Sequence, residues 1–404
     1  MNERIVIIGA GQAGSSMAAK LRALGHLGPL SLIGEEASPP YQRPPLSKKY
    51  LLGEVEGHRL HLRPLAFYAD QRIELITGAS AVAIDRQARE VALSDGERIP
   101  YGRLAITTGA RPRLLPEAIG GALRGVYPVR SLDHVDLMAS EFQPGARILI
   151  VGGGYIGLEA AAVAAQKGLE VTLIELAPRI LQRVAAAETS DYFRALHSER
   201  GVTIRESVGL ERLEGPGRVT RAVLSTGETL EIDFALVGVG VAPNQELAEA
   251  AGLLIDNGIA VDELCQTSDP AIYAAGDCAS FPYHGRRIRL ESVQNAIDQA
   301  EAAAAAMLGV GAPYAPTPWF WSDQYEVKLQ IAGLNQGYER VVIRPGAGLT
   351  QSVWYYQGDE LLAVDAMNDP RAYMVAKRLI EAGKSPAATV AADPAVELKT
   401  LLAG

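Results

Sequence analysis

A glycine-rich pattern occurs twice in the chain, and this repeat constrains the fold more than any other feature. IVIIGAGQAGSSMAAKLRALG begins at residue 5, and GGGYIGLEAAAVAAQKGLEVTLIE begins at residue 152. Both stretches fit the G-x-G-x-x-G pattern that cradles the pyrophosphate of a dinucleotide. One dinucleotide needs only one cradle. The chain therefore either binds two different dinucleotides or carries one idle copy of the fold.

The first copy has the local context that this pattern requires. The sequence predicts a strand over 4–8, a helix to about Leu24 and a second strand over 30–33. The first glycine permits the tight turn, the second lets the backbone approach a pyrophosphate, and the third lets helix and strand pack closely. Glu35 follows the second strand at about the spacing of an acid that accepts a ribose hydroxyl.

The second copy repeats this order, with a strand over 147–151, a helix over 158–167 and a strand over 171–174 that runs into Glu175. A carboxylate at this place binds the free 2′-hydroxyl of NAD and repels the 2′-phosphate of NADP. Arg179 and Arg183 follow closely. They would weaken the preference for NAD if they faced the ribose, although we expect surface positions for both.

Composition excludes several other classes of protein. A chain of 404 residues fits two or three domains, and a net charge of −9 disfavours binding to nucleic acid or an anionic membrane. No signal peptide or apolar run of membrane-spanning length is present, and two cysteines make no disulfide framework, so we expect a cytoplasmic protein. The six histidines lack ligand spacing, which predicts no metal site.

Two further motifs complete the set. IYAAGDCAS, from Ile272, places Asp277 after a strand and turn, and LAITTGARP places Thr107, Thr108 and Gly109 after another. Together with the two cradles, in this order, they resemble the two-dinucleotide flavoprotein reductases of the glutathione-reductase type, over nearly the whole chain. The resemblance implies an α/β fold with FAD on the first cradle and a nicotinamide cofactor on the second.

This resemblance predicts three domains. Residues 1–110 and 240–316 would form a discontinuous FAD-binding domain, 111–239 an inserted NAD-binding domain, and 317–404 a C-terminal α+β domain. Alternating apolar residues in KLQIAGL, YERVVIR, SVWYYQG and ELLAVDAM predict an antiparallel sheet in the last domain, followed by a helix over 370–382.

The cysteines exclude dithiol chemistry. Disulfide reductases carry a closely spaced cysteine pair beside the flavin, but Cys265 and Cys278 are thirteen positions apart. We expect Cys278 to be a small buried core residue rather than a redox group. Peroxidases and oxidases of this superfamily need a single reactive cysteine in the segment after Pro44, and YQRPPLSKKYLLG has none.

That same segment, with ESVQNAIDQA from Glu291 and PWFWSDQY from Pro318, resembles the reductases that feed [2Fe-2S] ferredoxins of oxygenase systems, the putidaredoxin, rhodocoxin and biphenyl-dioxygenase ferredoxin reductase type. The resemblance implies that Lys48 pairs with Glu159 beside the flavin as the catalytic pair. It implies FAD contacts for Gly9, Gly11, Ala13, Gly14, Glu35, Arg43, Lys48, Val82, Thr108, Gly109, Arg130, Asp277, Val293 and Trp321. It implies nicotinamide-cofactor contacts for Gly152, Gly154, Tyr155, Ile156, Gly157, Glu159, Glu175 and Gly240.

Three aromatic residues keep two interpretations each. Tyr155 lies either where the nicotinamide enters or in packing between domains. Trp319 and Trp321 either cover the flavin ring or belong to an ordinary hydrophobic core.

The function expected from this resemblance is electron transfer. NADH would give a hydride to FAD, and single electrons would pass to a [2Fe-2S] ferredoxin that supplies a cytochrome P450 or a Rieske oxygenase. The alternative is a redox-sensing flavoprotein of the apoptosis-inducing-factor type, but the targeting or basic segments usual in that type are absent. We expect a monomer or weak dimer whose local basic rim, with Arg59, Arg63 and Lys328 as candidates, docks an acidic ferredoxin.

Overall fold

The structure, a computed structural model, describes residues 3–402. Contacts within the chain divide it into two compact units. Unit 1 comprises 1–43, 57–111 and 241–316, and unit 2 comprises 44–56, 112–240 and 317–404. Each unit is therefore assembled from segments that are distant in the sequence.

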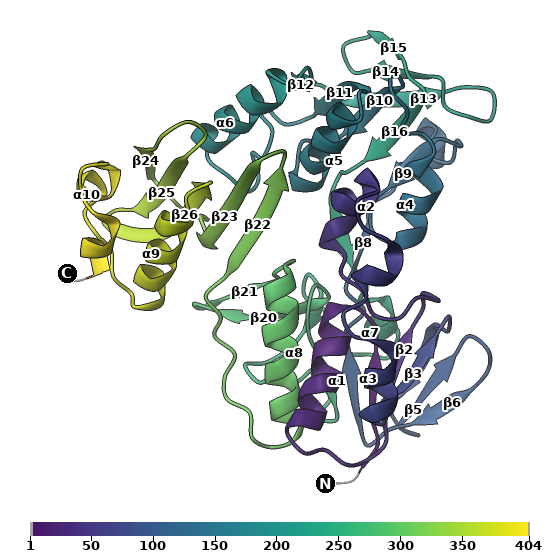
Figure 1. The fold of residues 1–404 in the computed structure, drawn as a ribbon. Helices are drawn as coiled ribbons and strands as arrows, with labels where there is room; N and C mark the ends of the chain where they lie inside the picture. The colour runs from purple at the N-terminus through teal and green to yellow at the C-terminus, as the bar shows by residue number, and fades with distance from the viewer. Residues whose placement is uncertain (1–2, 403–404) are drawn as a thin grey trace. The chain divides into compact units, whose positions relative to one another are not determined.

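Unit 1 is built on a five-stranded parallel sheet with strand order β19-β7-β1-β2-β3. Most of its side chains are buried, as expected for parallel strands covered on both faces. Helices α1 and α8 pack side by side (Figure 1) and bury their small residues against one face. The strands are β1 (Ile5–Ile8), β2 (Leu30–Gly34), β3 (Glu74–Thr77), β7 (Arg103–Ile106) and β19 (Ile272–Ala274), and the helices are α1 (Gln12–Ala23) and α8 (Val293–Met307).

Two small three-stranded sheets complete unit 1. Their apolar side chains form a second core with the other face of the parallel sheet. The sheets have the orders β4-β5-β6 and β18-β20-β21. The remaining elements of this unit are α3 (Leu65–Asp70), β4 (Ala81–Asp85), β5 (Glu90–Leu93), β6 (Arg98–Pro100), β17 (Val241–Pro243), α7 (Glu246–Ala250), β18 (Ile259–Ala260), β20 (Ala279–Tyr283) and β21 (Arg286–Ile288), with β8 (Ala110–Pro112) at its boundary.

Unit 2 contains a second parallel sheet, with strand order β12-β11-β10-β16-β9. A three-stranded sheet, β13-β14-β15, buries its apolar face against it. The elements of this part are α2 (Lys49–Leu52), β9 (Val126–Pro128), α4 (Leu132–Ala139), β10 (Arg147–Val151), α5 (Tyr155–Gln166), β11 (Glu170–Glu175), α6 (Ala187–Ser198), β12 (Thr203–Glu206), β13 (Leu210–Glu214), β14 (Arg221–Leu224), β15 (Thr229–Glu231) and β16 (Phe234–Val237).

The C-terminal part of unit 2 is a five-stranded antiparallel sheet with strand order β22-β23-β26-β25-β24. One face, with Trp354, Tyr356 and Val364, packs against α9 and α10. The elements are β22 (Trp319–Gln324), β23 (Val327–Gly333), β24 (Arg340–Pro345), β25 (Gln351–Gln357), β26 (Glu360–Met367), α9 (Pro370–Glu381) and α10 (Ala388–Ala392).

The predicted fold class is confirmed: two parallel α/β sheets each carry a cradle, and an antiparallel α+β part follows them. Helix α5 starts at Tyr155, three residues before the predicted start, because Gly154 in an extended conformation already serves as its N-cap. The three-domain division stays a prediction, since the contacts group 112–240 and 317–404 into one unit.

Candidate functional site

The two cradles have nearly the same backbone geometry. The amide of Gly9 donates to the carbonyl of Ile33 at 2.8 Å, and that of Gly152 to Ile174 at 2.9 Å. Their φ angles are +111° and +110°, in the region where side chains are strained. A Cβ on Gly9 would lie 2.3 Å from a backbone oxygen, and one on Gly152 would lie 2.4 Å from another. Only glycine fits at the first position of either fingerprint.

The third glycine of each fingerprint also has no room for a side chain. A Cβ on Gly14 would lie 2.0 Å from the Gly9 oxygen, and one on Gly157 would lie 2.1 Å from the Gly152 oxygen. The middle glycines differ, because a Cβ on Gly11 or Gly154 would meet nothing within 4 Å among the described residues. These open glycines are the N-caps of α1 and α5, and neither helix has a side-chain cap or an acidic residue in its first turn. Each cradle thus presents unpaired amides to open space, which fits a pyrophosphate.

The acidic residues that follow the cradles are not equivalent. Ile8 pairs with Ile33 and Val151 with Ile174, so Glu175 corresponds in register to Gly34, and Glu35 lies one position later. The Glu175 carboxylate accepts hydrogen bonds from the amides of Gly153, at 2.7 Å, and Ala177, at 2.8 Å. Glu35 is exposed beyond the end of β2. The negative charge is therefore bonded to the glycine loop only in the second cradle.

Arg43 is held by a residue that the sequence did not single out. Its guanidinium forms a 2.5 Å ion pair with Glu36, donates to the Tyr41 hydroxyl at 3.0 Å, and lies over the Tyr41 ring. The Tyr41 hydroxyl also donates to Glu36. Glu36 therefore binds Arg43 and Tyr41, whereas the adjacent Glu35 stays exposed. The tyrosine and arginine of the YQR tripeptide are the sequence feature that indicated a binding partner for an acid.

The TTGA turn (107–110) of LAITTGARP and the AAGD turn (274–277) of IYAAGDCAS both lie against the first cradle. The Thr107 hydroxyl donates to the Gly9 carbonyl at 2.8 Å, and the Thr108 hydroxyl donates to the Asn244 carbonyl at 2.7 Å. Gly276, which precedes Asp277, has φ +82° and would place a Cβ 3.1 Å from that of Ala13. The two turns therefore bring Thr108, Gly109 and Asp277 to the same end of the sheet as the fingerprint.

The other residues predicted to contact FAD are spread over several elements. Val82 is 57% exposed in β4, where the register with β5 shifts between Ala81 and Ala83. Such a bulge leaves the backbone of the extra residue out of the ladder. Val293 is the first residue of α8, and Arg130 precedes α4 in unit 2.

Lys48 and Glu159 meet in unit 2. The Lys48 ammonium lies 3.0 Å from the Glu159 carboxylate and 3.7 Å from that of Asp323. The hydroxyls of Ser47 and Ser322 each donate to Glu159 at 2.7 Å. Three donors thus hold one carboxylate whose side chain is 7% exposed, beside a lysine that is 14% exposed. The two serines lie within the stretches YQRPPLSKKYLLG and PWFWSDQY, but nothing in the sequence linked them to Glu159.

Burial dominates the electrostatics of this pair. It raises the pKa of the Glu159 carboxyl, and the Lys48 charge and the two hydroxyls offset part of that rise. The pair therefore depends on its lysine to keep a buried carboxylate charged.

Aromatic residues line the start of α5 and the adjacent strand. The ring of Tyr155 lies 4.9 Å from that of Phe320, and Ile156 beside it is 40% exposed. Trp321 and Trp319 alternate with Phe320 along β22, and their rings lie 5.7 Å apart. Because Trp319 also packs on Tyr373 of α9, the tryptophans lie on the sheet face opposite to Phe320.

The two arginines near the second cradle have different surroundings. Arg179 is fully engaged, donating to the carbonyls of Ala185 and Ala186 and to the Ser190 hydroxyl. Arg183 is exposed, and its guanidinium would lie 3.7 Å from a Cβ on Gly240, whose φ is +96°. Of these two arginines, only Arg183 therefore has an exposed guanidinium that can contact a nucleotide in the second cradle.

Both cysteines are free and buried. Burial raises the pKa of the Cys265 thiol to about 12 and also raises that of Cys278. The Cys278 thiol lies 3.5 Å from the carbonyl oxygens of Ile106 and Ala275. A thiol with a raised pKa in a packed core is a poor nucleophile, so the structure offers no dithiol relay.

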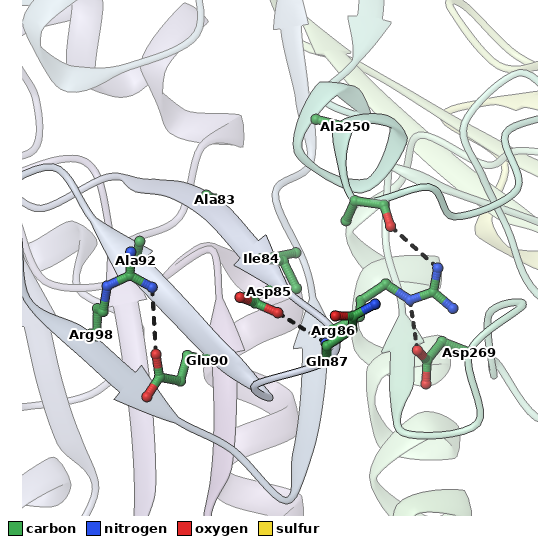
Figure 2. A pocket seen from close by; sticks show the side chains of 11 residues that line it. Ala83, Ile84, Asp85, Arg86, Gln87, Glu90, Ala92, Arg98, Ala250 and Asp269 are labelled. Carbon is green, nitrogen blue, oxygen red and sulfur yellow. Dashed lines mark hydrogen bonds and ion pairs between the residues drawn. The ribbon is translucent and has the colours of Figure 1, made fainter.

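A polar cavity of about 670 Å³ in unit 1 lies apart from these residues, since none of the predicted site residues lines it. Four of its five charged side chains pair with one another (Figure 2), Arg86 with Asp269 at 2.7 Å and Arg98 with Glu90 at 3.5 Å, while Asp85 accepts from the backbone amides of Gln87 and Ala88. These ion pairs join β4 and β5 to neighbouring segments. Because the charges of the cavity are used within the protein, the two cradles stay the candidate binding sites.

Within residues 3–402, no helix is long and apolar enough to span a membrane, and no group of three or more metal-ligating side chains is present.

The fold and the two cradles define a class of protein. Residues 3–300 match the family described as pyridine nucleotide-disulphide oxidoreductase, and residues 319–402 match the family described as reductase C-terminal. The chain belongs to the pyridine nucleotide-disulphide oxidoreductases. The resemblance inferred from the sequence motifs is confirmed.

Particular relatives are similar over at least 94% of their own lengths. Rhodocoxin reductase of Rhodococcus erythropolis is 42% identical over 99% of this chain and 94% of its own length. Putidaredoxin reductase CamA of Pseudomonas putida is 41% identical over 100% of this chain and 97% of its own. The reductase in the crystal structure of the covalent putidaredoxin reductase–putidaredoxin complex matches with a TM-score of 0.96 at 41% identity, over 100% of this chain and 98% of that one.

Proposed function

We propose that the chain is an FAD-containing, NADH-dependent ferredoxin reductase. The observation that carries this is the pair of complete cradles in a chain that lacks a reactive thiol pair. Two dinucleotides can then exchange electrons, and the acceptor must lie outside the chain. Full-length similarity to rhodocoxin and putidaredoxin reductases supports a ferredoxin as that acceptor.

FAD fits the first cradle, where Gly11 leaves open space before uncapped amides of α1 and the TTGA and AAGD turns converge. When bound, FAD accepts a hydride and releases electrons one at a time. The protein holds the pyrophosphate at Gly9, Gly11 and Gly14 and leaves backbone groups at Val82 available for the adenosine half.

Lys48 supplies positive charge to the flavin. A reduced flavin is an anion, so a fixed ammonium near the ring stabilises the reduced form. Glu159, Ser47 and Ser322 hold the ammonium and its counter-charge in one geometry. The pairing avoids an uncompensated buried charge.

NADH binds the second cradle, and Glu175 selects it over NADPH. The carboxylate is tied to the glycine loop through Gly153, which fixes a negative charge at the ribose end of the site. A 2′-phosphate would be repelled there, whereas a 2′-hydroxyl can donate to it. Arg183 opposes this preference only to the extent that it reaches the ribose.

The partner is a [2Fe-2S] ferredoxin that docks weakly through charge, and the reductase acts as a monomer or weak dimer in a reducing cytoplasm. Arg59, Arg63 and Lys328 are the proposed basic contacts. In unit 1 the Arg63 guanidinium lies over the Phe67 ring, 4.6 Å from its centre, which holds the charge in place without neutralising it.

The test uses the purified FAD-loaded protein. Stopped-flow absorbance should show rapid flavin reduction by NADH, and sustained reduction of cytochrome c should require added [2Fe-2S] ferredoxin. A flavin that NADH does not reduce contradicts the cofactor assignment. Rapid reduction of the flavin without any stimulation by ferredoxin contradicts the acceptor and favours the redox-sensing alternative.

A further inference from the structure

One face of the C-terminal sheet carries a single buried charge, Asp365, within a row of apolar residues. Across the sheet, Phe320 pairs with Ile331, Ile331 with Asp365, and Asp365 with Val353. Residues paired across strands point to the same face, so Phe320 and Asp365 share a face with Ile331 between them. Since the Tyr155 ring lies on Phe320, this face packs against the start of α5.

Asp365 is buried in this face and only half satisfied. One carboxylate oxygen, Oδ2, accepts from the Thr189 hydroxyl at 2.7 Å and from the Tyr355 hydroxyl. The Tyr355 oxygen in turn accepts from the Ala186 amide at 2.9 Å. The other oxygen, Oδ1, is buried and has no hydrogen-bond partner within residues 3–402. A buried carboxylate oxygen without a donor is costly, so its place calls for a donor.

Tyr155 presents the matching group. Its hydroxyl is also buried and has no hydrogen-bond partner among the described residues. The Asp365 charge acts on this hydroxyl, because it adds to burial in raising the pKa of Tyr155 well above the usual range. The ring of Tyr155 packs on the sheet face that carries Asp365, and its hydroxyl without an acceptor lies within electrostatic reach of a carboxylate oxygen without a donor.

We propose that Asp365 is a positioning residue for Tyr155: its free Oδ1 accepts the Tyr155 hydroxyl, directly or through one buried water, and so fixes the ring at the entrance to the second cradle. A shift of either side chain or one water satisfies both groups at once. The C-terminal sheet then sets the orientation of a cradle residue that it does not itself contain.

The consequence for binding rests on the proposed function, in which NADH occupies the second cradle. Tyr155 is the first residue of α5 and follows the open Gly154 directly, so its backbone borders the space that a dinucleotide enters in the proposed function. Fixing the ring removes rotamer freedom before the ligand arrives, and pre-organisation of this kind strengthens binding.

The contact itself is tested by thermal unfolding of the FAD-loaded protein. Tyr155→Phe removes only the hydroxyl. If that hydroxyl binds Asp365, the melting temperature falls by about 1–4 °C. Tyr355→Phe is the matched control, because it removes a hydroxyl that is bonded to the same carboxylate. A melting temperature that stays level or rises in Tyr155→Phe, while it falls in Tyr355→Phe, overturns the proposal.

The positioning role is tested by kinetics with ferricyanide as acceptor. We expect Tyr155→Phe and Asp365→Ala each to raise the KM for NADH by three- to tenfold, with no further rise in the double variant. Thr189→Val removes a bond to the other oxygen of Asp365, so it should lower stability and leave this KM unchanged.

Independent effects of Tyr155→Phe and Asp365→Ala on KM, or none, overturn the positioning role. If Asp365→Ala does not fold, the KM of Tyr155→Phe and the melting comparison decide. If NADH does not reduce the flavin of the wild-type protein, that result contradicts the proposed function instead. The melting comparison still tests the contact between Tyr155 and Asp365.

Discussion

Replacing Lys48 with methionine removes the ammonium from Glu159 and keeps a side chain of similar length. Both partners are largely buried, at 14% and 7% exposure, and their charged atoms are 3.0 Å apart. Removing one partner of a buried pair costs about 3–5 kcal/mol, because the remaining charge is uncompensated. The hydroxyls of Ser47 and Ser322 remain on the carboxylate and reduce this cost. We expect a loss of about 2–4 kcal/mol in the free energy of unfolding at pH 8.

The loss should depend on pH with a defined sign. Burial already raises the pKa of Glu159, and removal of Lys48 takes away the largest opposing influence, so the folded-state pKa rises further. A group whose folded pKa lies above its unfolded value, about 4.3 for glutamate, favours folding most below that value. The deficit of the variant should therefore nearly vanish below about pH 4.3 and grow as the pH rises through the folded-state pKa.

Urea unfolding of wild type, Lys48→Met and Lys49→Met at pH 5 and pH 8 measures this effect. Lys49 is the adjacent lysine and is exposed, so it controls for the loss of one positive charge. Adding Glu159→Gln to Lys48→Met should restore stability, because a neutral amide needs no counter-charge: its oxygen accepts from one serine hydroxyl, and its nitrogen donates to the other. Stopped-flow reduction by NADH should also be slower in Lys48→Met, and the flavin potential lower.

Three results would refute the reasoning. Equal losses in Lys48→Met and Lys49→Met would make Lys48 an ordinary surface lysine. A deficit that is larger at pH 5 than at pH 8 would mean that Glu159 is not the group left unpaired. Flavin reduction at the wild-type rate in Lys48→Met would show that the ion pair of Lys48 and Glu159 does not act on the flavin.

Further predictions concern the two cradles and the partner. Wild-type kcat/KM should favour NADH over NADPH by at least about tenfold, the ratio that 1.4 kcal/mol gives, and Glu175→Ala should narrow it in steady-state assays. Gly14→Ala places a Cβ 2.0 Å from the Gly9 oxygen, so it should abolish FAD retention on gel filtration, whereas Gly11→Ala should fold and retain FAD more weakly. Arg63→Glu should raise the KM for ferredoxin several-fold and flatten its salt dependence; an unchanged KM at low salt would remove Arg63 from the docking surface.

The sequence predicted the cradles well because their requirements are local. A positive φ at Gly9 and Gly152, and close approach at Gly14 and Gly157, are met within a few residues of chain or by the next strand of the sheet. The strands beside them are continuous apolar runs, which length and composition identify. For the same reason the observed strand and helix boundaries differ from the predicted ones by only a few residues.

The contacts around Glu159 and Asp365 were not accessible in this way. Ser47 and Glu159 are 112 residues apart, Ser322 and Glu159 are 163 apart, and Thr189 and Asp365 are 176 apart. No periodicity relates such positions. Lys48 was assigned to Glu159 only through resemblance to a family, while Asp365 lies in a strand whose alternation predicted the sheet but not a buried charge.

The middle glycines of the two cradles indicate whether one cradle is an idle copy of the fold. Gly9, Gly14, Gly152 and Gly157 are required by the protein's own packing, and an idle copy would need them as much as a working one. Gly11 and Gly154 have no such requirement, because a side chain there would touch nothing in the described protein. Glycine at a helix N-cap lacks the side-chain hydrogen bond that serine or aspartate would supply, so the first amides of both helices stay open to a bound group. Both cradles are thus built for a ligand, and because the acid bonded to the loop is present only in the second, the two ligands are not the same.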